Sequence, residues 1–285
     1  MTRRRFPVGK TLLYVFMSLW ALTTIYPFIW VILNSFKPRG LIRSDTFSLP
    51  IGDKFTLENY VTAFKRVDIG TAYVNSIVIS GAVTVVVMVL AGLAAYAMVR
   101  YSFRLRGFLH SMIIASMMFP VSSTIIPVFR MESSWGIVNT GSIWLTRLSV
   151  VLPQIAGNLS FAIIVLMGFI RSLPVDLEEA AYLEGYNVYQ IFFRIIMPLA
   201  KPSFATVGIF TFLWSYNDLF LQMFFLRSKK FFTITRLLNE ISSQAGTNYG
   251  LMVAAVVMVV IPVLVVYIFL QNYIIKGMTA GAVKG

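Results

Sequence analysis

Six long apolar blocks constrain the fold of this 285-residue sequence more than any other feature. They occupy residues 11–33, 73–99, 107–128, 148–170, 203–226 and 251–275. A helix needs about 20 apolar residues to cross the hydrocarbon core of a bilayer. Five blocks contain no Asp, Glu, Lys or Arg, and the remaining one contains only Asp218. None shows the alternating polarity of barrel strands. The pattern predicts an all-α polytopic membrane protein with six transmembrane helices.

Composition restricts the classes of protein to which the chain can belong. Hydrophobic residues make up 58% of it and charged residues 12%, too few to cover the surface of a soluble domain. The absence of cysteine and the presence of one histidine, His110, exclude disulfides, thiolate sites and multi-histidine metal sites. The net charge of +13 comes from basic residues scattered between the blocks. Such scattering indicates contact with membrane lipid and not with nucleic acid.

Lysine and arginine between the blocks set the expected orientation. Their raw numbers on the two sides tie at 12 each. The rule that cytosolic loops are basic gives most weight to short loops near the first spans, where "TRRRFPVGK" and "RYSFRLR" hold seven basic and no acidic residues. This weighting places both termini in the cytosol. The N-terminal block lacks a small-residue cleavage site and is therefore expected to stay as a first span. This orientation places 100–106, 171–202 and 276–285 in the cytosol, and 34–72, 129–147 and 227–249 outside.

Residues 173–202, which we name the elbow, read "LPVDLEEAAYLEGYNVYQIFFRIIMPLAKP" and lie on the expected cytosolic side. Asp176 and Glu179 are the expected capping pair of a first short helix, because carboxylates suit a helix N-terminus. Gly185 is its expected end, since glycine adopts the left-handed backbone found there. A second helix then follows, so the segment is predicted to be two short helices joined at a glycine bend.

The second helix of the elbow is apolar on nearly every side. Asn187 and Gln190 are its expected cap, and Pro198 its expected end. A helix that is apolar all round must be covered all round. Either another protein covers it, or it lies in the headgroup layer of the membrane. Its apolar residues are Ile191, Phe192, Phe193, Ile195, Ile196 and Met197.

The elbow resembles the coupling motif of permease subunits in ATP-binding-cassette (ABC) importers. That motif reads Glu-Ala-Ala, three residues, Gly, nine residues, Ile, one residue, Leu-Pro. This chain departs from it only in carrying methionine in place of the leucine. The matching residues are Glu179, Ala180, Ala181, Gly185, Ile195, Met197 and Pro198.

Further stretches resemble the maltose-type carbohydrate permeases of this family. They are "YVNSIVISGAVTVVVMVLAGLAAYAMVRYSF", "WSYNDLFL" and "LQNYIIKGMTAGAVKG", and the resemblance extends over essentially the whole chain. It implies a type I importer permease, with residues 1–285 as a single transmembrane domain that includes the coupling loop 173–202. The implied function is to move a carbohydrate, in particular an oligosaccharide, inward across a bacterial cytoplasmic (inner) membrane.

The resemblance also implies partners. They are a second homologous permease subunit, two ATP-binding subunits that dock at the elbow, and an extracytoplasmic solute-binding protein. The chain itself has no Gly-x-x-x-x-Gly-Lys-Ser/Thr phosphate loop, so it is expected to hold no cofactor and not to be an enzyme. ATP and magnesium would bind on the partner subunits.

Uncharged polar side chains within the blocks are candidate solute contacts. Three hydroxyls between Pro120 and Pro127 either line a pathway or bond back to carbonyls that the prolines free. Two amides four residues apart serve either interhelix packing or solute contact. The intramembrane carboxylate either has a functional role, caps a local break or pairs with the partner permease. The candidates are Ser122, Ser123, Thr124, Gln154, Asn158, Asn217 and Asp218.

The identity of the solute leaves alternatives. No cation lies deep in the blocks, which fits a neutral sugar. Five basic residues near the expected outer ends either attract an acidic saccharide or anchor lipid headgroups. Other possible functions are an ABC permease for a non-sugar solute and an ion-coupled secondary transporter, which would need more intramembrane charge than Asp218 supplies. The five basic residues are Arg130, Arg147, Arg227, Lys229 and Lys230.

Overall fold

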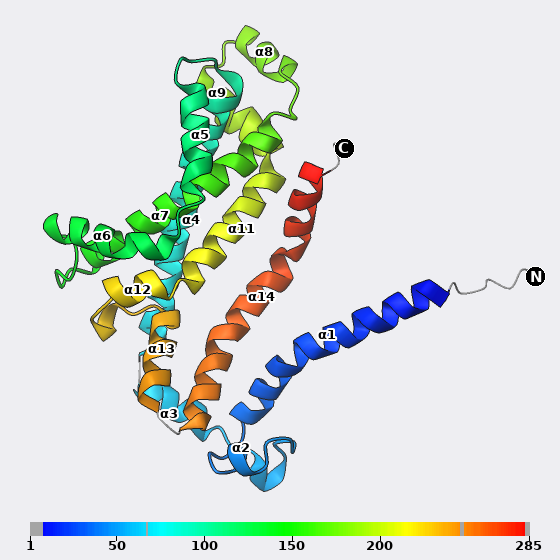
Figure 1. The fold of residues 1–285 in the computed structure, drawn as a ribbon, viewed down its shortest axis with the longest axis vertical. Helices are drawn as coiled ribbons and strands as arrows, with labels where there is room; N and C mark the ends of the chain where they lie inside the picture. The colour runs from blue at the N-terminus through cyan, green and yellow to red at the C-terminus, as the bar shows by residue number, and fades with distance from the viewer. Residues whose placement is uncertain (1–7, 67, 246–247, 283–285) are drawn as a thin grey trace, which may run out of the picture. The chain divides into compact units, whose positions relative to one another are not determined.

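The computed structural model of the protein describes residues 8–66, 68–245 and 248–282. Within these ranges all regular secondary structure is helical (Figure 1). The chain divides into two compact units, Met1–Asp68 with Leu238–Pro262, and Ile69–Leu237 with Val263–Gly285. The single transmembrane domain over 1–285 stays a prediction.

An asparagine side chain joins the helices of the first unit. Asn59 Nδ2 donates to the carbonyls of Ser35 and Lys37, at 2.9 and 2.8 Å. A Cβ on Gly250 would clash with Asn59 Oδ1, so this close approach requires glycine. The unit contains α1 (Val8–Ser35), α2 (Leu41–Ser44), η1 (Gly52–Lys54), α3 (Glu58–Arg66), most of α13 (Ile234–Ala245) and the start of α14 (Tyr249–Ala282).

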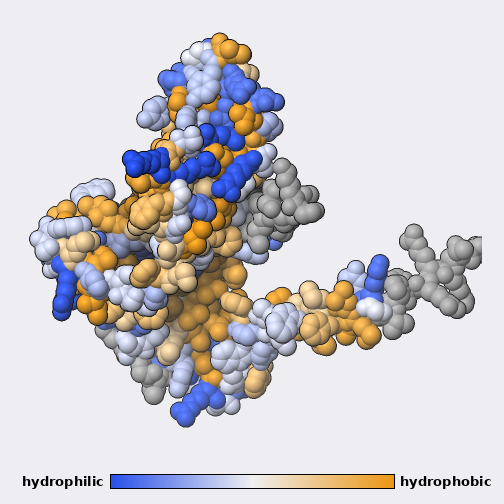
Figure 2. Space-filling model, turned by 45° about the horizontal axis from the view of Figure 1, so that its top comes forward, coloured by the Kyte–Doolittle hydropathy of each residue, from blue (hydrophilic) through white to orange (hydrophobic). Residues whose placement is uncertain are grey.

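Helix α1 exposes apolar side chains along its length, seen as its mostly orange surface in Figure 2. Tyr14 and Trp20 are 70% and 65% exposed. A helix that is apolar on every side and is not covered by its own chain is suited to lipid.

The core of the second unit lies between α4, α7 and α11. Small or β-branched residues of α4 at four-residue spacing are fully buried there, namely Val83, Val87, Ala91 and Ala95. Such side chains let helix backbones approach closely, which is how helices pack within a membrane. The helices of this unit before the shared α13 and α14 are α4 (Ile69–Arg100), α5 (Arg106–Ser116), α6 (Val121–Ser134), α7 (Ile143–Ile170), α8 (Asp176–Leu183), α9 (Val188–Ile191), η2 (Phe192–Ile196), α10 (Met197–Leu199), α11 (Lys201–Asn217), α12 (Phe220–Phe225) and η3 (Lys229–Phe231).

Three helices of the described chain, α1, α4 and α7, are each long and apolar enough to cross a membrane. Two bent pairs also qualify when each pair counts as one span. They are Arg106–Ser116 with Val121–Ser134, bent by 104°, and Val188–Leu199 with Lys201–Asn217, bent by 83°. Where its side chains are described, α14 gives a shorter apolar helix, Tyr249–Val265. Every predicted apolar block thus contains one of these helices, and the all-α polytopic fold is confirmed.

Two of the blocks are not the continuous helices that the sequence predicts. Block 107–128 breaks between α5 and α6, where Pro120 is extended with φ −69° and ψ 123°. Proline lacks an N–H donor and disfavours helical geometry in the residue before it. Block 203–226 breaks at Asp218, which is extended with φ −67° and ψ 107°. Each break frees backbone groups that need partners inside the membrane.

Polar contacts at the two ends of α4 show which connecting segments of this unit lie at the same end of the helix. At its C-terminal end, Arg100 bonds Glu178 of the elbow at 2.6 Å. Near its start, Asn75 donates to the carbonyl of Lys230 at 3.3 Å and accepts from Arg147 at 2.9 Å. Asn75 and Arg100 are 25 residues apart in α4, so the two groups lie about 38 Å apart along the helix, more than the thickness of a bilayer's hydrocarbon core. This agrees with the predicted alternation of loops. The assignment of the elbow side to the cytosol stays a prediction, and residues 283–285 of the predicted cytosolic tail lie outside the described residues.

Candidate functional site

A buried ion pair joins the first elbow helix to α4. Glu178 Oε1 accepts from Arg100 Nε at 2.6 Å, and Glu178 Oε2 accepts from Tyr96 Oη at 2.8 Å. The side chains of Arg100 and Glu178 are 11% and 5% exposed. Arg100 Nη2 also donates to the carbonyl of Leu173 at 2.9 Å. Both carboxylate oxygens therefore have partners, which a buried charge requires.

The start of α8 differs from the prediction. Neither Asp176 nor Glu179 forms a capping bond, because Val175 before them already has helical dihedrals, φ −71° and ψ −29°. The carboxylates still lie in the first turn, where the helix dipole favours negative charge. At the exposed edge of α8, the hydroxyls of Tyr101 and Tyr182 lie 3.0 Å apart, and this hydrogen bond raises the pKa of Tyr182.

The bend between the two elbow helices has the predicted geometry. Gly185 has φ +84°, a conformation that disfavours any residue with a Cβ. Tyr186 N donates to the carbonyl of Ala181 at 3.0 Å and closes the first helix. Asn187 and Gln190 form the predicted capping box, with two hydrogen bonds of 2.9 Å. Local sequence therefore fixes the direction in which the second helix leaves the bend.

The second elbow helix continues past its predicted end. It runs from α9 through the π turn η2 into α10 and ends at Leu199. Pro198 therefore does not stop it. The π turn widens the helix directly before the proline, which cannot donate an N–H group. Ile191, Phe192 and Ile196 of this helix are fully buried by the same chain, whereas Phe193 is 44% exposed.

Phe192 anchors the second elbow helix on α4. Its ring centroid lies 5.7 Å from that of Tyr96 and 6.4 Å from that of Phe204. On α4, a Cβ at Gly92 would come within 2.9 Å of Phe192 Cζ and 2.8 Å of Phe204 Cζ. Glycine at position 92 therefore lets both rings approach the helix backbone.

The motif residues all lie on the elbow but differ in exposure. Ala181 faces the chain and is buried. Glu179, Ala180, Gly185 and Pro198 are exposed, and Ile195 and Met197 are partly buried. The outer surface also carries apolar side chains, and at the top of Figure 2 they lie among hydrophilic ones. Apart from Tyr182, whose hydroxyl bonds that of Tyr101, the exposed apolar residues that form this outer surface are Leu177, Leu183, Val188, Tyr189 and Phe193.

Sequence reasoning missed the residues that hold the elbow. Tyr96 and Arg100 belong to a helix more than 70 positions away from Glu178 in the chain. A partial signal was present, because Glu178 lies three residues before Ala181 and so shares its helix face. A carboxylate on a face that packs inward needs a partner.

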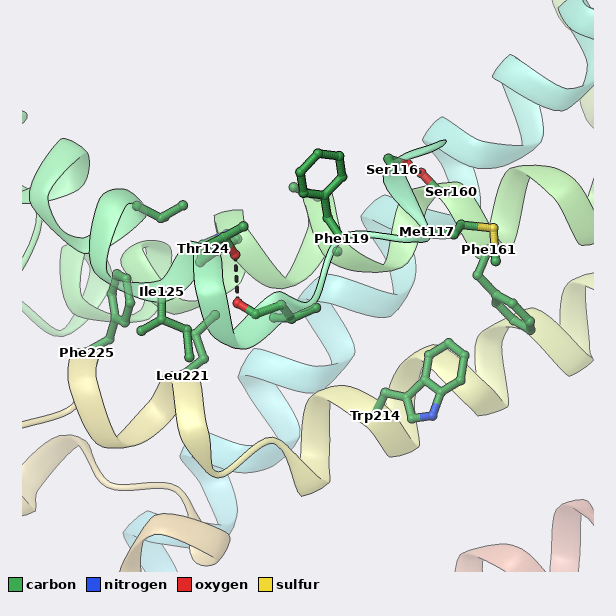
Figure 3. Close-up of a pocket in the computed structure, with 15 residues that line it drawn as sticks. Ser116, Met117, Phe119, Thr124, Ile125, Ser160, Phe161, Trp214, Leu221 and Phe225 are labelled. Carbon is green, nitrogen blue, oxygen red and sulfur yellow. Dashed lines mark hydrogen bonds between the residues drawn. The ribbon is translucent and has the colours of Figure 1, made fainter. Parts of the chain in front are cut away.

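A groove formed by two adjoining cavities follows the break between α5 and α6. The cavities have volumes of about 490 and 530 Å³ and are also lined by α7, α11 and α12. Figure 3 shows the smaller cavity, with Trp214 and Phe161 toward one end and Phe225 beside Leu221 and Ile125 toward the other. The ring centroids of Trp214 and Phe161 lie 4.8 Å apart. The two cavities share Val121, Ile125, Pro153, Gly157, Trp214 and Leu221.

Five of the predicted pathway residues lie on the larger cavity, and four of them have polar atoms bonded inside the chain. Gln154 Nε2 donates to Asp218 Oδ2 at 3.0 Å, and Ser215 Oγ donates to Gln154 Oε1 at 2.5 Å. Asn158 donates to the carbonyl of Gln154 at 2.7 Å. Asp218 Oδ1 accepts from Leu221 N at 3.1 Å, so this carboxylate caps the local break, one of the three alternatives. Asn217, the fourth, donates to the carbonyl four residues before it at 2.9 Å.

Two of the three hydroxyls between the two prolines bond back to the backbone, although not to the carbonyl of Ser123, which Pro127 leaves without a donor. Ser123 and Thr124 each donate to the carbonyl three residues earlier, at 2.7 and 2.8 Å (Figure 3 for Thr124). Ser122 lines the larger cavity. The groove therefore combines apolar walls with a few uncharged polar groups and the carboxylate of Asp218.

Comparison with known proteins gives a consistent result. Residues 88–280 match the model of a family described as "Binding-protein-dependent transport system inner membrane component". The chain is 33% identical over 273 residues to the diacetylchitobiose uptake system permease protein NgcG of Streptomyces coelicolor, covering 95% of this chain and 88% of that protein. It is 32% identical over 263 residues to the trehalose transport system permease protein SugB of Mycobacterium tuberculosis, covering 92% and 93%.

The fold has a counterpart among solved structures. The chain superposes with a TM-score of 0.81 on a chain from the crystal structure of a bacterial ABC transporter involved in the import of the acidic polysaccharide alginate. The match covers 96% of this chain and 99% of that chain at 24% sequence identity. The architecture expected of an importer permease is therefore confirmed.

Proposed function

The chain belongs to the family of binding-protein-dependent transport system inner membrane components, as a multi-pass permease subunit of an ABC importer, and we propose that its solute is a carbohydrate, in particular an oligosaccharide. One observation carries this proposal. More than 90% of the chain is similar to permeases named for the uptake of diacetylchitobiose and for the transport of trehalose. Because the similarity extends over this length of the chain, it is not confined to the coupling motif.

The groove suits a sugar chemically. Trp214 and Phe161 offer aromatic faces, on which the C–H groups of a sugar ring can pack, and Trp214 is 47% exposed. Ser122, Asn158 and Asn217 supply uncharged polar atoms at the larger cavity. A concave, mostly apolar site with a few polar groups is the usual form of a small-molecule site.

The basic residues of the second unit at the end opposite the elbow favour a neutral solute over an acidic one. Arg147 donates to Asn75, and Arg227 lies 5.1 Å over the ring of Phe129. Lys230 lies 5.6 Å over the ring of Phe231. These cations pack on aromatic rings and amides of their own chain, as membrane-surface anchors do.

Coupling to ATP is assigned to the elbow. Its exposed apolar side chains, beside the exposed Glu179, form a surface that suits a cleft on an ATP-binding subunit. ATP and magnesium would bind on two such subunits, a second homologous permease would complete the pathway, and a solute-binding protein would deliver the sugar outside. This arrangement requires the elbow and both termini in the cytosol of a bacterial cell.

The test uses the complete complex with its binding protein in proteoliposomes. Neutral oligosaccharides should stimulate ATP hydrolysis and enter the vesicles, and salt should change the solute-dependent step little. Trp214→Ala removes one aromatic face of the groove. The solute concentration for half-maximal uptake should rise about tenfold, which corresponds to a loss of about 1.4 kcal/mol in binding free energy. Trp144→Ala is the matched control, since this exposed tryptophan lies outside both cavities.

Each alternative predicts a different result. Stimulation confined to uronic-acid oligomers would make the solute acidic. Stimulation by amino acids or phosphate esters alone would identify an ABC permease for a non-sugar solute. Uptake that follows an ion gradient without ATP would identify a secondary transporter.

A further inference from the structure

We propose that Glu178 is a positioning residue that joins the elbow and α4 into one rigid body, which stays closed throughout the transport cycle. Displacement of the elbow would then reach the membrane directly through α4. The inference rests on the proposed function, because it assumes that ATP-binding subunits displace the elbow.

Both elbow helices attach to one stripe of α4. Gly92, Tyr96 and Arg100 are four residues apart and therefore share a helix face. Tyr96 and Arg100 bind Glu178 of the first elbow helix, and Gly92 receives the ring of Phe192 from the second. Because the attachment uses both sides of the Gly185 bend, the elbow cannot pivot about either helix alone.

Burial makes this attachment difficult to open. The Arg100–Glu178 pair is nearly excluded from solvent, so separating it would leave two charges without partners in a poorly polarisable surrounding. An ion pair at the surface, Lys54–Asp45 at 2.6 Å, has side chains 44% and 38% exposed. Water can replace the partners of that exposed pair at little cost.

The stripe also leads to the groove. On the N-terminal side of this stripe, α4 buries Ala91, Val87 and Val83 in the core that it shares with α7 and α11. These two helices carry Phe161 and Trp214 of the groove. A movement of the α4 end is therefore transmitted through packed side chains and does not depend on a flexible loop.

The first experiment separates coupling from assembly. In the reconstituted complex, Glu178→Gln should leave ATP-binding subunits attached and ATP hydrolysis near normal, while solute taken up per ATP falls at least about fivefold, since the amide keeps the size of the carboxylate but not its charge. Asp45→Asn is the matched control and should keep the normal ratio. A normal ratio in Glu178→Gln overturns the proposal.

The second experiment tests whether the attachment stays closed. Tyr101→Cys with Tyr182→Cys places one thiol on each side of it, where the two hydroxyls lie 3.0 Å apart. The native chain has no cysteine, so a bismaleimide as long as two tyrosine side chains reacts only at these positions, given partner subunits without accessible cysteines. Cross-linking should preserve uptake, and should partly restore the ratio in Glu178→Gln. Loss of uptake on cross-linking overturns the rigid attachment.

These experiments also distinguish the two proposals. If the wild-type complex shows no solute-stimulated ATP hydrolysis, the proposed function fails. If it does, and cross-linking blocks uptake, only the rigid attachment fails. Should Glu178→Gln not assemble, Tyr96→Phe removes one hydroxyl donor, keeps the ring contact with Phe192, and should lower the ratio in the same direction. An unchanged ratio in Tyr96→Phe, with uptake blocked by the cross-link, is the result against the proposal.

Discussion

Gln154 of α7 donates a 3.0 Å hydrogen bond to Asp218 at the break between α11 and α12, joining positions 64 residues apart. The same carboxylate accepts from Leu221 N, the donor that the break frees. One side chain thus satisfies backbone and side-chain donors within a membrane segment, where an unpaired polar group is costly. The break lies on the groove, so its stability also fixes the shape of the groove.

The first prediction concerns this carboxylate. Asp218→Ala removes the acceptor for Leu221 N and for Gln154, so the folded state should lose about 1–3 kcal/mol. Thermal unfolding of the detergent-purified complex measures this loss. Asn217→Ala is the neighbouring control, because its exposed side chain bonds only within its own turn, and its midpoint should barely move. Equal midpoints for the two variants would contradict the capping role.

A second prediction concerns the elbow bend. Gly185 has φ +84°, and no atom lies within 4 Å of a Cβ built there, so backbone strain alone limits the position. Asparagine tolerates this conformation better than valine, which pays about 1–2 kcal/mol. Uptake should therefore fall in the order glycine, Gly185→Asn, Gly185→Val, at equal membrane levels. Gly185→Asp should abolish uptake, since it adds charge at the docking surface. Full uptake by Gly185→Asp would remove the bend from the coupling mechanism.

Two glycines of α4 provide a third prediction. A Cβ at Gly92 meets the buried rings of Phe192 and Phe204 below 3.0 Å, whereas a Cβ at Gly81 meets nothing within 4 Å. Gly92→Ala should overpack this contact and destabilise the protein by about 1–3 kcal/mol. Gly81→Ala should be neutral or stabilise by about 0.5–1 kcal/mol, because alanine favours helices. Unfolding midpoints of the two variants, measured side by side, check the difference. A higher midpoint for Gly92→Ala than for Gly81→Ala would refute the close approach.

The fourth prediction concerns orientation. Ser172→Cys lies beside the elbow and Ser228→Cys beside the opposite end of the second unit, and both positions are exposed. An impermeant thiol reagent applied to intact spheroplasts should label Ser228→Cys and spare Ser172→Cys. Permeabilised cells should label both, which controls for reactivity. Labelling of Ser172→Cys alone would place the elbow outside and exclude docking of a cytosolic ATPase.

Local sequence patterns predicted much of the architecture. The apolar blocks predicted the helices, because a chain in lipid must satisfy its own backbone hydrogen bonds. Gly185 as a bend and Asn187 with Gln190 as a capping box were predicted correctly, since each depends on residues within one turn. The Asp176 cap was wrong because the helix geometry already begins at Val175.

The sequence by itself determined that this protein is a helical membrane chain with a two-helix elbow, because periodicity, caps and motif spacing act over a few residues. Only the tertiary structure decided that Glu178 pairs with Arg100 and Tyr96, and that Asp218 turns inward to Gln154. These partners come from helices 64 to 82 positions apart. Their choice depends on which helix faces meet, and one chain's local pattern carries no record of that packing.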